Sequence, residues 1–222
     1  MAKAVKSRRT YNGTLRTEQA QMTRGRILDA ARRLLTRGTY SSVTMEDIAT
    51  EAGVAYQTVY AIFGTKLKLA QGLIEIGFPH VADALKLFDE VDQSADPEVG
   101  LRTAARVSRL IYELCADLLR FMRESGDPGL LARYREREEE RLKGMTQHEV
   151  PKLLGRSGRL RAGMSPSEAV AVLWALSGPD QYTQLVFERG WTPAHYEEWL
   201  GDALINTLLE PTAPPALRAT SP

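Results

Sequence analysis

Residues 44–63 have the sequence TMEDIATEAGVAYQTVYAIF, and this stretch decides how the N-terminal part of the chain folds. Thr44 is suited to start a helix, because its hydroxyl can accept a hydrogen bond from a free backbone N–H and acidic residues follow in the first turn. Gly53 supplies the backbone freedom that a tight turn requires. The stretch therefore predicts two short helices, at residues 44–52 and 55–63, joined by a glycine turn.

The second predicted helix has an apolar face and a polar face. Its apolar residues recur at positions i, i+4, i+7 and i+8 and are expected to form one buried stripe. They are Ala55, Val59, Ile62 and Phe63. Two short helices that cross through small residues, the second with an exposed polar face, are typical of a helix-turn-helix. A helical hairpin without any DNA-binding role explains the same pattern and remains the alternative from these residues alone.

The surrounding residues extend the pattern over positions 24–69. Before the capping threonine, an ILDAA sequence starts a preceding helix and Gly38 makes a turn. After it come the motifs Asp-Ile-Ala, Ala-Gly-Val and Thr-x-Tyr-x-x-Phe, and then a lysine that opens a further helix. In this order and spacing the segment resembles the DNA-binding domain of the TetR family of bacterial transcriptional regulators. Residues 174–200, WALSGPDQYTQLVFERGWTPAHYEEWL, also look like the end of the ligand-binding domain in many family members.

The resemblance implies a homodimeric transcriptional repressor. Each subunit would place the helix at 55–63 in the major groove of one half of a palindromic double-stranded DNA operator, and an unknown small-molecule effector in the C-terminal domain would release the DNA. The family positions that commonly contact phosphates are occupied by Thr44, Thr58, Tyr60 and Lys66. Those that commonly read base edges are occupied by Tyr56 and Gln57.

The chemistry of these residues agrees with the roles that the resemblance implies. Gln57 can bond an adenine edge through two hydrogen bonds, and the phenol of Tyr60 can donate to a phosphate oxygen. The alternative for Tyr56 and Tyr60 is that they are half-buried aromatic residues whose role is packing. Ala55 departs from the family, which usually has Ser or Thr there, so the recognition helix should lack a side-chain cap. Residues 52–65 contain no Lys or Arg, so arginine cannot read guanine from this helix.

Charge is divided unevenly along the 222 residues, although the formal net charge is only +1. Residues 1–70 contain 12 Lys and Arg against 5 Asp and Glu, whereas the rest of the chain contains 17 against 23. The basic N-terminal third favours contact with a polyanion. Its first part is expected to be a DNA-binding arm along the backbone or in the minor groove, with an ordinary solvated tail as the alternative. The cations of this arm are Lys3, Lys6, Arg8, Arg9 and Arg16.

The whole chain is predicted to be all-α, because strand patterns are scarce and capping residues before prolines are frequent. The expected helices span residues 18–37, 44–52, 55–63, 66–91 with a break near Gly77 and Pro79, 97–124, 128–149, 166–189 with a kink or break at Gly178 and Pro179, and 193–209. The chain is expected to have four parts. They are a disordered basic arm at 1–17, a DNA-binding domain at 18–66, a helical ligand-binding and dimerisation domain at 67–210 and a disordered proline-rich tail at 211–222.

Apolar stripes on the last helices suggest a dimer interface. Two helices of each subunit would form a four-helix interface, as the family implies, although the stripes could equally pack within one subunit. The expected interface residues are Leu173, Leu176, Trp199, Leu200 and Leu204. A ligand pocket should lie between residues 97 and 189, because pockets are mostly apolar with a few polar groups. Its candidate walls, each of which could also be core, are Tyr112, Phe121, Met122, Tyr134, Trp174 and Tyr182.

Other functional classes fit the sequence less well. No nucleophile motif or phosphate-binding glycine loop is present, and the three histidines lack metal-ligand spacing, so we expect no enzyme, no cofactor and no metal. A non-specific architectural DNA-binding protein is the remaining alternative. The single cysteine, the lack of a secretory signal and the lack of a membrane-spanning run indicate a cytoplasmic protein.

Overall fold

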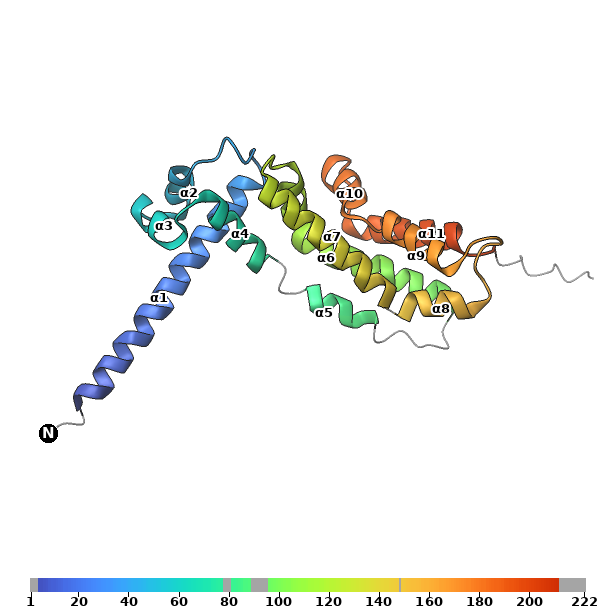
Figure 1. Ribbon diagram of the computed structural model, residues 1–222, viewed down its shortest axis with the longest axis horizontal. Coiled ribbons are helices and arrows are strands. Elements are labelled where there is room, and N and C mark those ends of the chain that lie inside the picture. The colour runs from blue at the N-terminus through green and yellow to red at the C-terminus, as the bar shows by residue number, and fades with distance from the viewer. Residues whose placement is uncertain (1–3, 78–80, 89–95, 148, 212–222) are drawn as a thin grey trace, which may run out of the picture. The chain divides into compact units, whose positions relative to one another are not determined.

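The computed structural model describes residues 4–77, 81–88, 96–147 and 149–211, with side chains from residue 17 onward except at 82 and 149–150. Within these ranges the chain is helical, and the only bridge between extended residues is an isolated pair, Leu160 with Leu209. The predicted all-α class is therefore confirmed. Figure 1 labels the α-helices. In chain order, the elements are α1 (Ala4–Leu35), α2 (Met45–Ala52), α3 (Tyr56–Phe63), α4 (Lys66–Ile76), α5 (Val81–Leu85), the 3₁₀ turn η1 (Lys86–Phe88), α6 (Pro97–Glu124), α7 (Pro128–Gln147), α8 (Glu149–Ser157), α9 (Pro166–Leu176), α10 (Pro179–Tyr182), the π-helical η2 (Thr183–Glu188) and α11 (Pro193–Leu208).

The chain divides into two compact units. The first comprises Met1–Phe78 and Asp117–Arg133, and the second comprises Pro79–Ala116 and Tyr134–Pro222. Helices α6 and α7 therefore contribute a segment to each unit. The first unit is larger than the DNA-binding domain expected at 18–66, because α4 packs on α1 and α3 and the turn between α6 and α7 joins the same core.

The core of the first unit forms where α2, α3 and α4 gather around the second half of α1 (Figure 1). On α1 the apolar residues recur three and four positions apart, so they lie on one face and are withdrawn from water together. The buried residues of these four helices are Ile27, Leu28, Ala30, Ala31, Leu35, Ile48, Ala49, Ala52, Val59, Phe63, Leu69, Ala70, Leu73 and Ile74. This core fixes how α3 is presented.

Helix α1 is longer than the sequence predicts. It begins at Ala4, whereas the basic segment was expected to lack regular structure up to residue 17. Residues 4–16 contain no proline and are mostly residues with fair helix propensity, so the helix nucleated by the buried part of α1 can extend through them. The side chains of this segment, and residues 1–3 altogether, lie outside the described part.

The turn between α6 and α7 supplies the remaining wall of the first unit. The ring of Phe121 packs against Tyr40 with the centroids 5.9 Å apart, and Met122 beside it is fully buried. Gly77 meets the same segment so closely that an added Cβ would clash with Leu118 Cδ1. Phe121 and Met122 therefore belong to the core of the first unit, and their role as walls of a ligand pocket stays a prediction.

In the second unit, α9 packs against α8 and α11. Ser165 and Thr192 cap α9 and α11 ahead of a proline, as the sequence predicts, and Gly178-Pro179 separates α9 from α10. Helix α8 was not expected as a separate helix, because no Ser, Thr, Asp or Asn directly precedes Glu149, although Pro151 lies in its first turn. In the described ranges, no helix is both long and apolar enough to cross a membrane.

The apolar stripes of α9 and α11 face each other within one chain. Leu173, Leu200 and Leu204 are at most 2% exposed, because these two helices pack together. These three leucines are therefore not available to a partner subunit, and the prediction that they form the dimer interface has to be corrected. Leu176 and Trp199 keep part of their surface in solvent and stay candidates. The stripes are a core pattern, as the alternative interpretation held.

Candidate functional site

The turn between α2 and α3 has the geometry of a helix-turn-helix. Thr44 Oγ1 accepts from Asp47 N at 3.0 Å, and the Asp47 carboxylate accepts from Thr44 N at 2.9 Å, so the start of α2 is closed by a reciprocal capping box. These hydrogen bonds, first from the Thr44 backbone and then from its hydroxyl, lower the pKa of Asp47. Gly53 ends the helix with φ 63°, in the left-handed region that favours glycine.

An arginine from α1 fixes this turn from the side. Arg26 Nη2 donates to Ala52 O at 2.6 Å and to Gly53 O at 3.2 Å, and so satisfies carbonyls at the end of α2 that have no partner within the helix. A positive guanidinium at a helix C-terminus also meets the negative end of the helix dipole. The angle at which the chain enters α3 is therefore set by a side chain from another helix.

Helix α3 presents a polar and aromatic face to solvent. Val59 and Phe63 are 0% and 5% exposed and anchor the helix in the core, whereas Tyr56 and Tyr60 are 38% and 57% exposed. Gln57 is exposed between them. The two tyrosine rings lie 6.1 Å apart between centroids. The side chains predicted to read base edges are therefore accessible, while the 38% exposure of Tyr56 also fits the alternative of a half-buried packing aromatic.

The buried stripe of α3 is narrower than predicted. Ala55 and Ile62 are exposed, with 37% of Ile62 in solvent, so only the residues that face α1, α2 and α4 are covered. Ala55 holds the N-cap position in extended geometry and forms no side-chain cap hydrogen bond, as its departure from the family pattern predicts. Thr58 is half-buried on the side of the helix.

Two of the predicted phosphate contacts are committed to the protein itself. Lys66 Nζ donates to Tyr40 O at 2.6 Å and Val43 O at 2.9 Å, and lies 4.4 Å from the centroid of the Tyr40 ring. The hydroxyl proton of Thr44 is donated to Asp47 at 2.8 Å. Lys66 therefore holds a loop in place with two of its three ammonium N–H groups, and its contact with a phosphate stays a prediction. A phosphate at Thr44 would have to compete with the capping box.

Lys68 is a cation that the sequence pattern did not single out. It lies at the third position of α4, where its backbone N–H donates to the capping hydroxyl of Thr65 at 3.1 Å, and its side chain is exposed. A helix N-terminus with a nearby ammonium group suits an anion. Its ammonium has no hydrogen-bond or ion-pair partner among the described residues. The predicted arm residues Lys3, Lys6, Arg8, Arg9 and Arg16 lie outside the described side chains, so the arm stays a prediction.

The remaining pocket candidates, Tyr112, Tyr134, Trp174 and Tyr182, all belong to the second unit. The Tyr112 hydroxyl donates to Ser177 O at 2.6 Å, and burial raises the pKa of Tyr112 well above its ordinary value. Its ring lies 5.7 Å from that of Tyr182. Tyr112 and Tyr182 therefore lie in a buried aromatic cluster of the second unit, and their role as walls of a ligand pocket stays a prediction.

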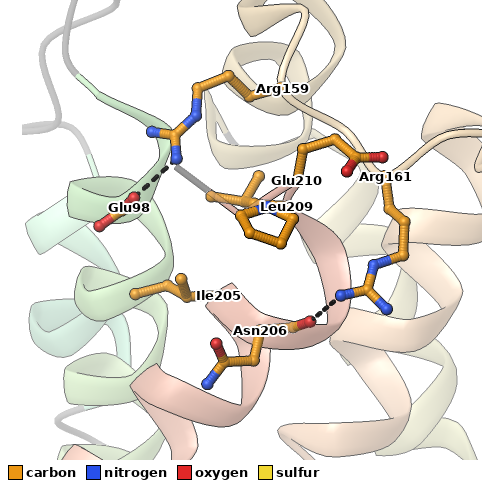
Figure 2. Close-up of a pocket in the computed structure, with 8 residues that line it drawn as sticks. Glu98, Arg159, Arg161, Ile205, Asn206, Leu209 and Glu210 are labelled. Atoms are coloured by element: carbon orange, nitrogen blue, oxygen red, sulfur yellow. Dashed lines mark hydrogen bonds and ion pairs between the residues drawn. The ribbon is translucent and has the colours of Figure 1, made fainter. Parts of the chain in front are cut away.

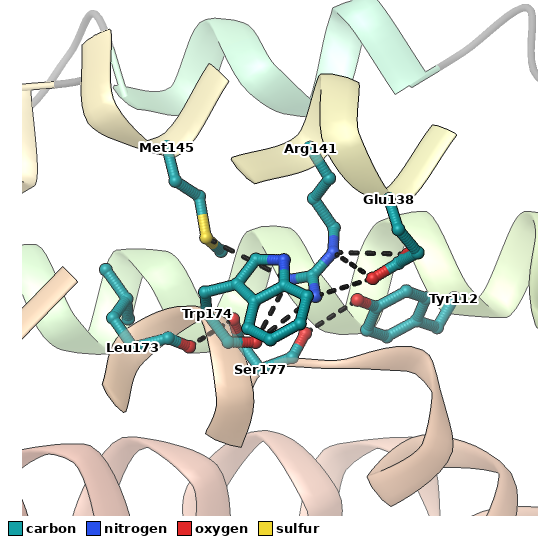
Figure 3. A network of polar contacts seen from close by, with 7 residues as sticks. All are labelled: Tyr112, Glu138, Arg141, Met145, Leu173, Trp174 and Ser177. Carbon is teal, nitrogen blue, oxygen red and sulfur yellow. Dashed lines mark hydrogen bonds and ion pairs between the residues drawn. The ribbon is translucent and has the colours of Figure 1, made fainter. Parts of the chain in front are cut away.

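Figure 3 shows a polar network beside this aromatic cluster, centred on Arg141 of α7. Its guanidinium lies 5.1 Å from the Trp174 ring centroid, pairs with Glu138 at 2.8 Å and donates to Trp174 O at 3.2 Å. Both charged side chains are mostly buried, at 20% and 17% exposure. In the sequence, the run REREEERLK at residues 135–143 predicts only a solvated, charged helix face, because the pattern does not show that Arg141 turns inward.

Figure 2 shows a separate cleft of about 250 Å³ beside the end of α11. None of the predicted pocket residues lines it. Arg159 pairs with Asp96 and Glu98 at 2.8 Å each, and Arg161 Nη2 donates to Asn206 O at 2.7 Å. These contacts hold the segment after α8 against α6 and α11. Within the described residues, no group of three or more His, Cys, Asp and Glu side chains is placed to bind a metal ion.

Comparison with known proteins finds a family match over the helix-turn-helix. Residues 27–73 match the family described as "Bacterial regulatory proteins, tetR family". The HTH-type transcriptional regulator AlkX of Mycobacterium tuberculosis is 40% identical over 77 residues, which cover 35% of this chain and 34% of AlkX. TtgR of Pseudomonas putida is 37% identical over 78 residues, which cover 34% of this chain and 37% of TtgR. The chain thus spans about a third of the length of these curated relatives.

Solved structures resemble the fold over most of the chain. NalD, the secondary repressor of the MexAB-OprM multidrug efflux pump in Pseudomonas aeruginosa, has a TM-score of 0.61 at 22% identity, covering 86% of this chain and 97% of NalD. FadR from Bacillus subtilis, in complex with stearoyl-CoA, has a TM-score of 0.60 at 18% identity, covering 82% of this chain and 97% of FadR. At such identities the likeness concerns the fold alone. Over residues 27–73, the chain is similar to the tetR family of bacterial regulatory proteins.

Proposed function

We propose that this chain is a sequence-specific transcriptional repressor that binds a palindromic DNA operator as a homodimer and is released by a small molecule. It acts by binding and not by catalysis, in the cytoplasm, where its operator lies. The observation that carries the proposal is the accessible face of α3, with Tyr56, Gln57 and Tyr60 in solvent above the buried anchors Val59 and Phe63.

The DNA-contacting surface combines base reading from α3 with phosphate contacts from its surroundings. Gln57 offers the amide that pairs with an adenine edge, and its neighbours Tyr56 and Tyr60 supply aromatic and hydroxyl contacts. Because α3 has no Lys or Arg, most of the electrostatic affinity must come from cations elsewhere. Lys68 and the basic segment of residues 3–16 are the cations that we assign to this role.

Dimerisation and effector binding belong to the second unit in this proposal. NalD is a repressor and FadR is a transcriptional regulator solved in complex with stearoyl-CoA, so repression and small-molecule binding both occur in proteins of this fold. Two-fold symmetry of a dimer matches a palindromic operator, in which each subunit binds one half-site. With Leu173, Leu200 and Leu204 buried inside the chain, the partner would meet the outer faces of α9 and α11, which include Leu176 and Trp199.

Selection of binding sites from random double-stranded DNA with the full chain tests the proposal. We expect recovery of a palindrome, bound by a species that sediments as a dimer. Recovery of unrelated sequences, all bound equally, would instead indicate a non-specific architectural protein. A monomer that binds single half-sites would contradict the homodimer.

The role of Gln57 is tested on the selected palindrome and on a version with one half-site base pair changed. Gln57→Ala should reduce the discrimination between the two by about tenfold, because a good bidentate pair contributes about 1–3 kcal/mol. The matched control is Gln21→Ala, which removes an exposed glutamine of α1. Unchanged discrimination in Gln57→Ala would rule out its assigned role.

A further inference from the structure

The outward face of α3 carries an amide and several apolar groups. Gln57 and Ala61 are both exposed and lie four positions apart, so they follow each other along the side of the helix that points away from the buried Val59. Tyr60 and Ile62 flank this line, with 57% and 37% of their surfaces in solvent. We refer to Gln57, Tyr60, Ala61 and Ile62 as the reading face.

No charge belongs to the reading face or to the residues next to it in the sequence. Residues 52–65 contain no Asp, Glu, Lys or Arg. Before them, Glu51 pairs with Arg33 at 2.8 Å, and after them Lys66 donates two hydrogen bonds to loop carbonyls. The charged residues that bound this stretch are therefore held by other parts of the protein.

The four bases require different side chains in the major groove. Guanine is read mainly by Arg or Lys, and the amino group of cytosine by Asp or Glu, whereas adenine pairs with an amide such as that of Gln57. Thymine presents a methyl group, which contacts apolar side chains such as alanine. A G·C pair beneath Ala61 and Ile62 would lose water from its polar edge without gaining hydrogen bonds. The reading face thus matches adenine and thymine only.

We propose that the operator half-site presents A·T base pairs to α3, with an adenine bonded to the amide of Gln57 and thymine methyl groups in contact with Ala61 and Ile62. This assignment rests on the proposed function, in which α3 enters the major groove of the operator. It names the base pairs that α3 recognises. It also assigns the recognition to direct contact, and not to the shape of A·T-rich DNA.

Selection from random double-stranded DNA identifies the base pairs under α3. The selection is carried out with the full-length wild type and repeated with Gln57→Ala and Ile62→Ala. Positions at which either variant changes the preferred base are the positions that α3 contacts. We expect the wild type to select A·T at these positions, and selection of G·C there would overturn the assignment.

Base analogues test for direct contact at these positions. Deoxyuridine in place of thymine removes only the methyl group, and should raise the Kd by about fourfold, the loss expected for one buried methyl. 7-Deazaadenine in place of adenine removes the N7 acceptor, and should raise the Kd by about fivefold or more, because the Gln57 amide loses a partner. Fluorescence anisotropy with labelled duplexes measures both.

Two isoleucine variants link the thymine methyl to the reading face. In Ile62→Ala, deoxyuridine at the contacted position should no longer weaken binding, because the methyl has already lost its partner. Ile76→Ala is the matched control: it truncates an isoleucine at the end of α4 that is 45% exposed, and should keep the fourfold loss. Circular dichroism confirms that both variants are folded.

The outcomes separate this assignment from the proposed function. Unchanged affinity for every analogue duplex means that A·T pairs are recognised through DNA shape, which overturns direct contact by α3. A palindrome with G·C under α3 likewise defeats the assignment alone. An A·T half-site bound by a monomer contradicts the homodimer but supports the assignment. Equal binding of all sequences defeats the proposed function, and this assignment with it.

Discussion

Arg32 at the end of α1 and Asp117 on α6 form a bidentate ion pair inside the first unit. Arg32 Nε donates to Asp117 Oδ2 at 2.9 Å, and Nη2 donates to Oδ1 at 2.8 Å. Close by, Arg120 Nη2 donates to Thr36 O at 3.0 Å. Because the two ends of the pair are 85 residues apart in the sequence, they join the last turn of α1 to a segment outside the helix-turn-helix.

Breaking this pair should destabilise the first unit. Asp117→Asn is expected to lower the free energy of unfolding by about 1 kcal/mol, because paired hydrogen bonds between partly buried charges are stronger than those of an exposed pair. The control is Arg33→Gln, which breaks a single, more exposed contact with Glu51 and should cost only about a few tenths of a kcal/mol. Urea unfolding measures both. Equal losses in the two variants would contradict the special role of Arg32 and Asp117.

The two lysines of α4 should separate stability from DNA binding. Lys66→Met leaves the carbonyls of Tyr40 and Val43 without their donor and is expected to reduce stability by about 1–3 kcal/mol. Lys68→Gln should leave stability unchanged but weaken operator binding, and should reduce the slope of log K against log salt by about one. The reverse assignment, with Lys66 controlling the slope, would show that its contacts to the loop are given up on DNA.

Helix α3 should gain stability from a cap that it lacks. Ala55 has extended backbone angles, φ −67° and ψ 143°, which suit an N-cap, so Ala55→Ser is expected to raise the free energy of unfolding by about 1 kcal/mol. Thr65→Ala is the opposite change on α4, where it removes the hydroxyl that accepts from Lys68 N, and should cost a similar amount. Thermal unfolding compares them. If Ala55→Ser does not change the stability, solvent already satisfies the free backbone N–H groups at the start of α3.

Alkaline pH should unfold the second unit through its buried tyrosines. Burial raises the pKa of Tyr182 to about 12, and it also raises the pKa of Tyr196. A folded pKa above the unfolded value stabilises the protein below about pH 10, and this stabilisation is lost as pH rises through the folded values. For Tyr182 the loss amounts to about 2 kcal/mol. Tryptophan fluorescence follows it, because all three tryptophans belong to this unit. Tyr182→Phe should flatten the decline between pH 10 and 12, and a profile identical to wild type would contradict this cause.

The helix-turn-helix could be predicted from sequence because its signals are local. Thr44 and Gly53 lie at the ends of α2 that they were expected to mark, and Val59 and Phe63 are buried as their spacing predicts. Capping and helical periodicity act over a few residues, so a short stretch of sequence contains the whole cause. The breaks at Gly77 and at Gly178 could be predicted for the same reason.

What could not be predicted depends on contacts between distant segments. The position of Lys66 suggests a free cation, yet its acceptors are the carbonyls of Tyr40 and Val43, more than twenty residues earlier. Leu200 and Leu204 form a stripe whose pattern requires burial but does not say against what. Phe121 is likewise apolar in either setting, and only its contact with Tyr40 assigns it to the first unit.

The anchoring of α3 by its inner residues and by Arg26 has a consequence for engineering. The orientation of α3 is set by Val59, Phe63 and a guanidinium on another helix, so the outward positions are not needed to anchor the helix. Randomising Tyr56, Gln57 and Tyr60 as a library should therefore yield proteins that fold normally and differ in the operator they prefer. The scaffold can be retargeted to new promoters without redesigning its interior.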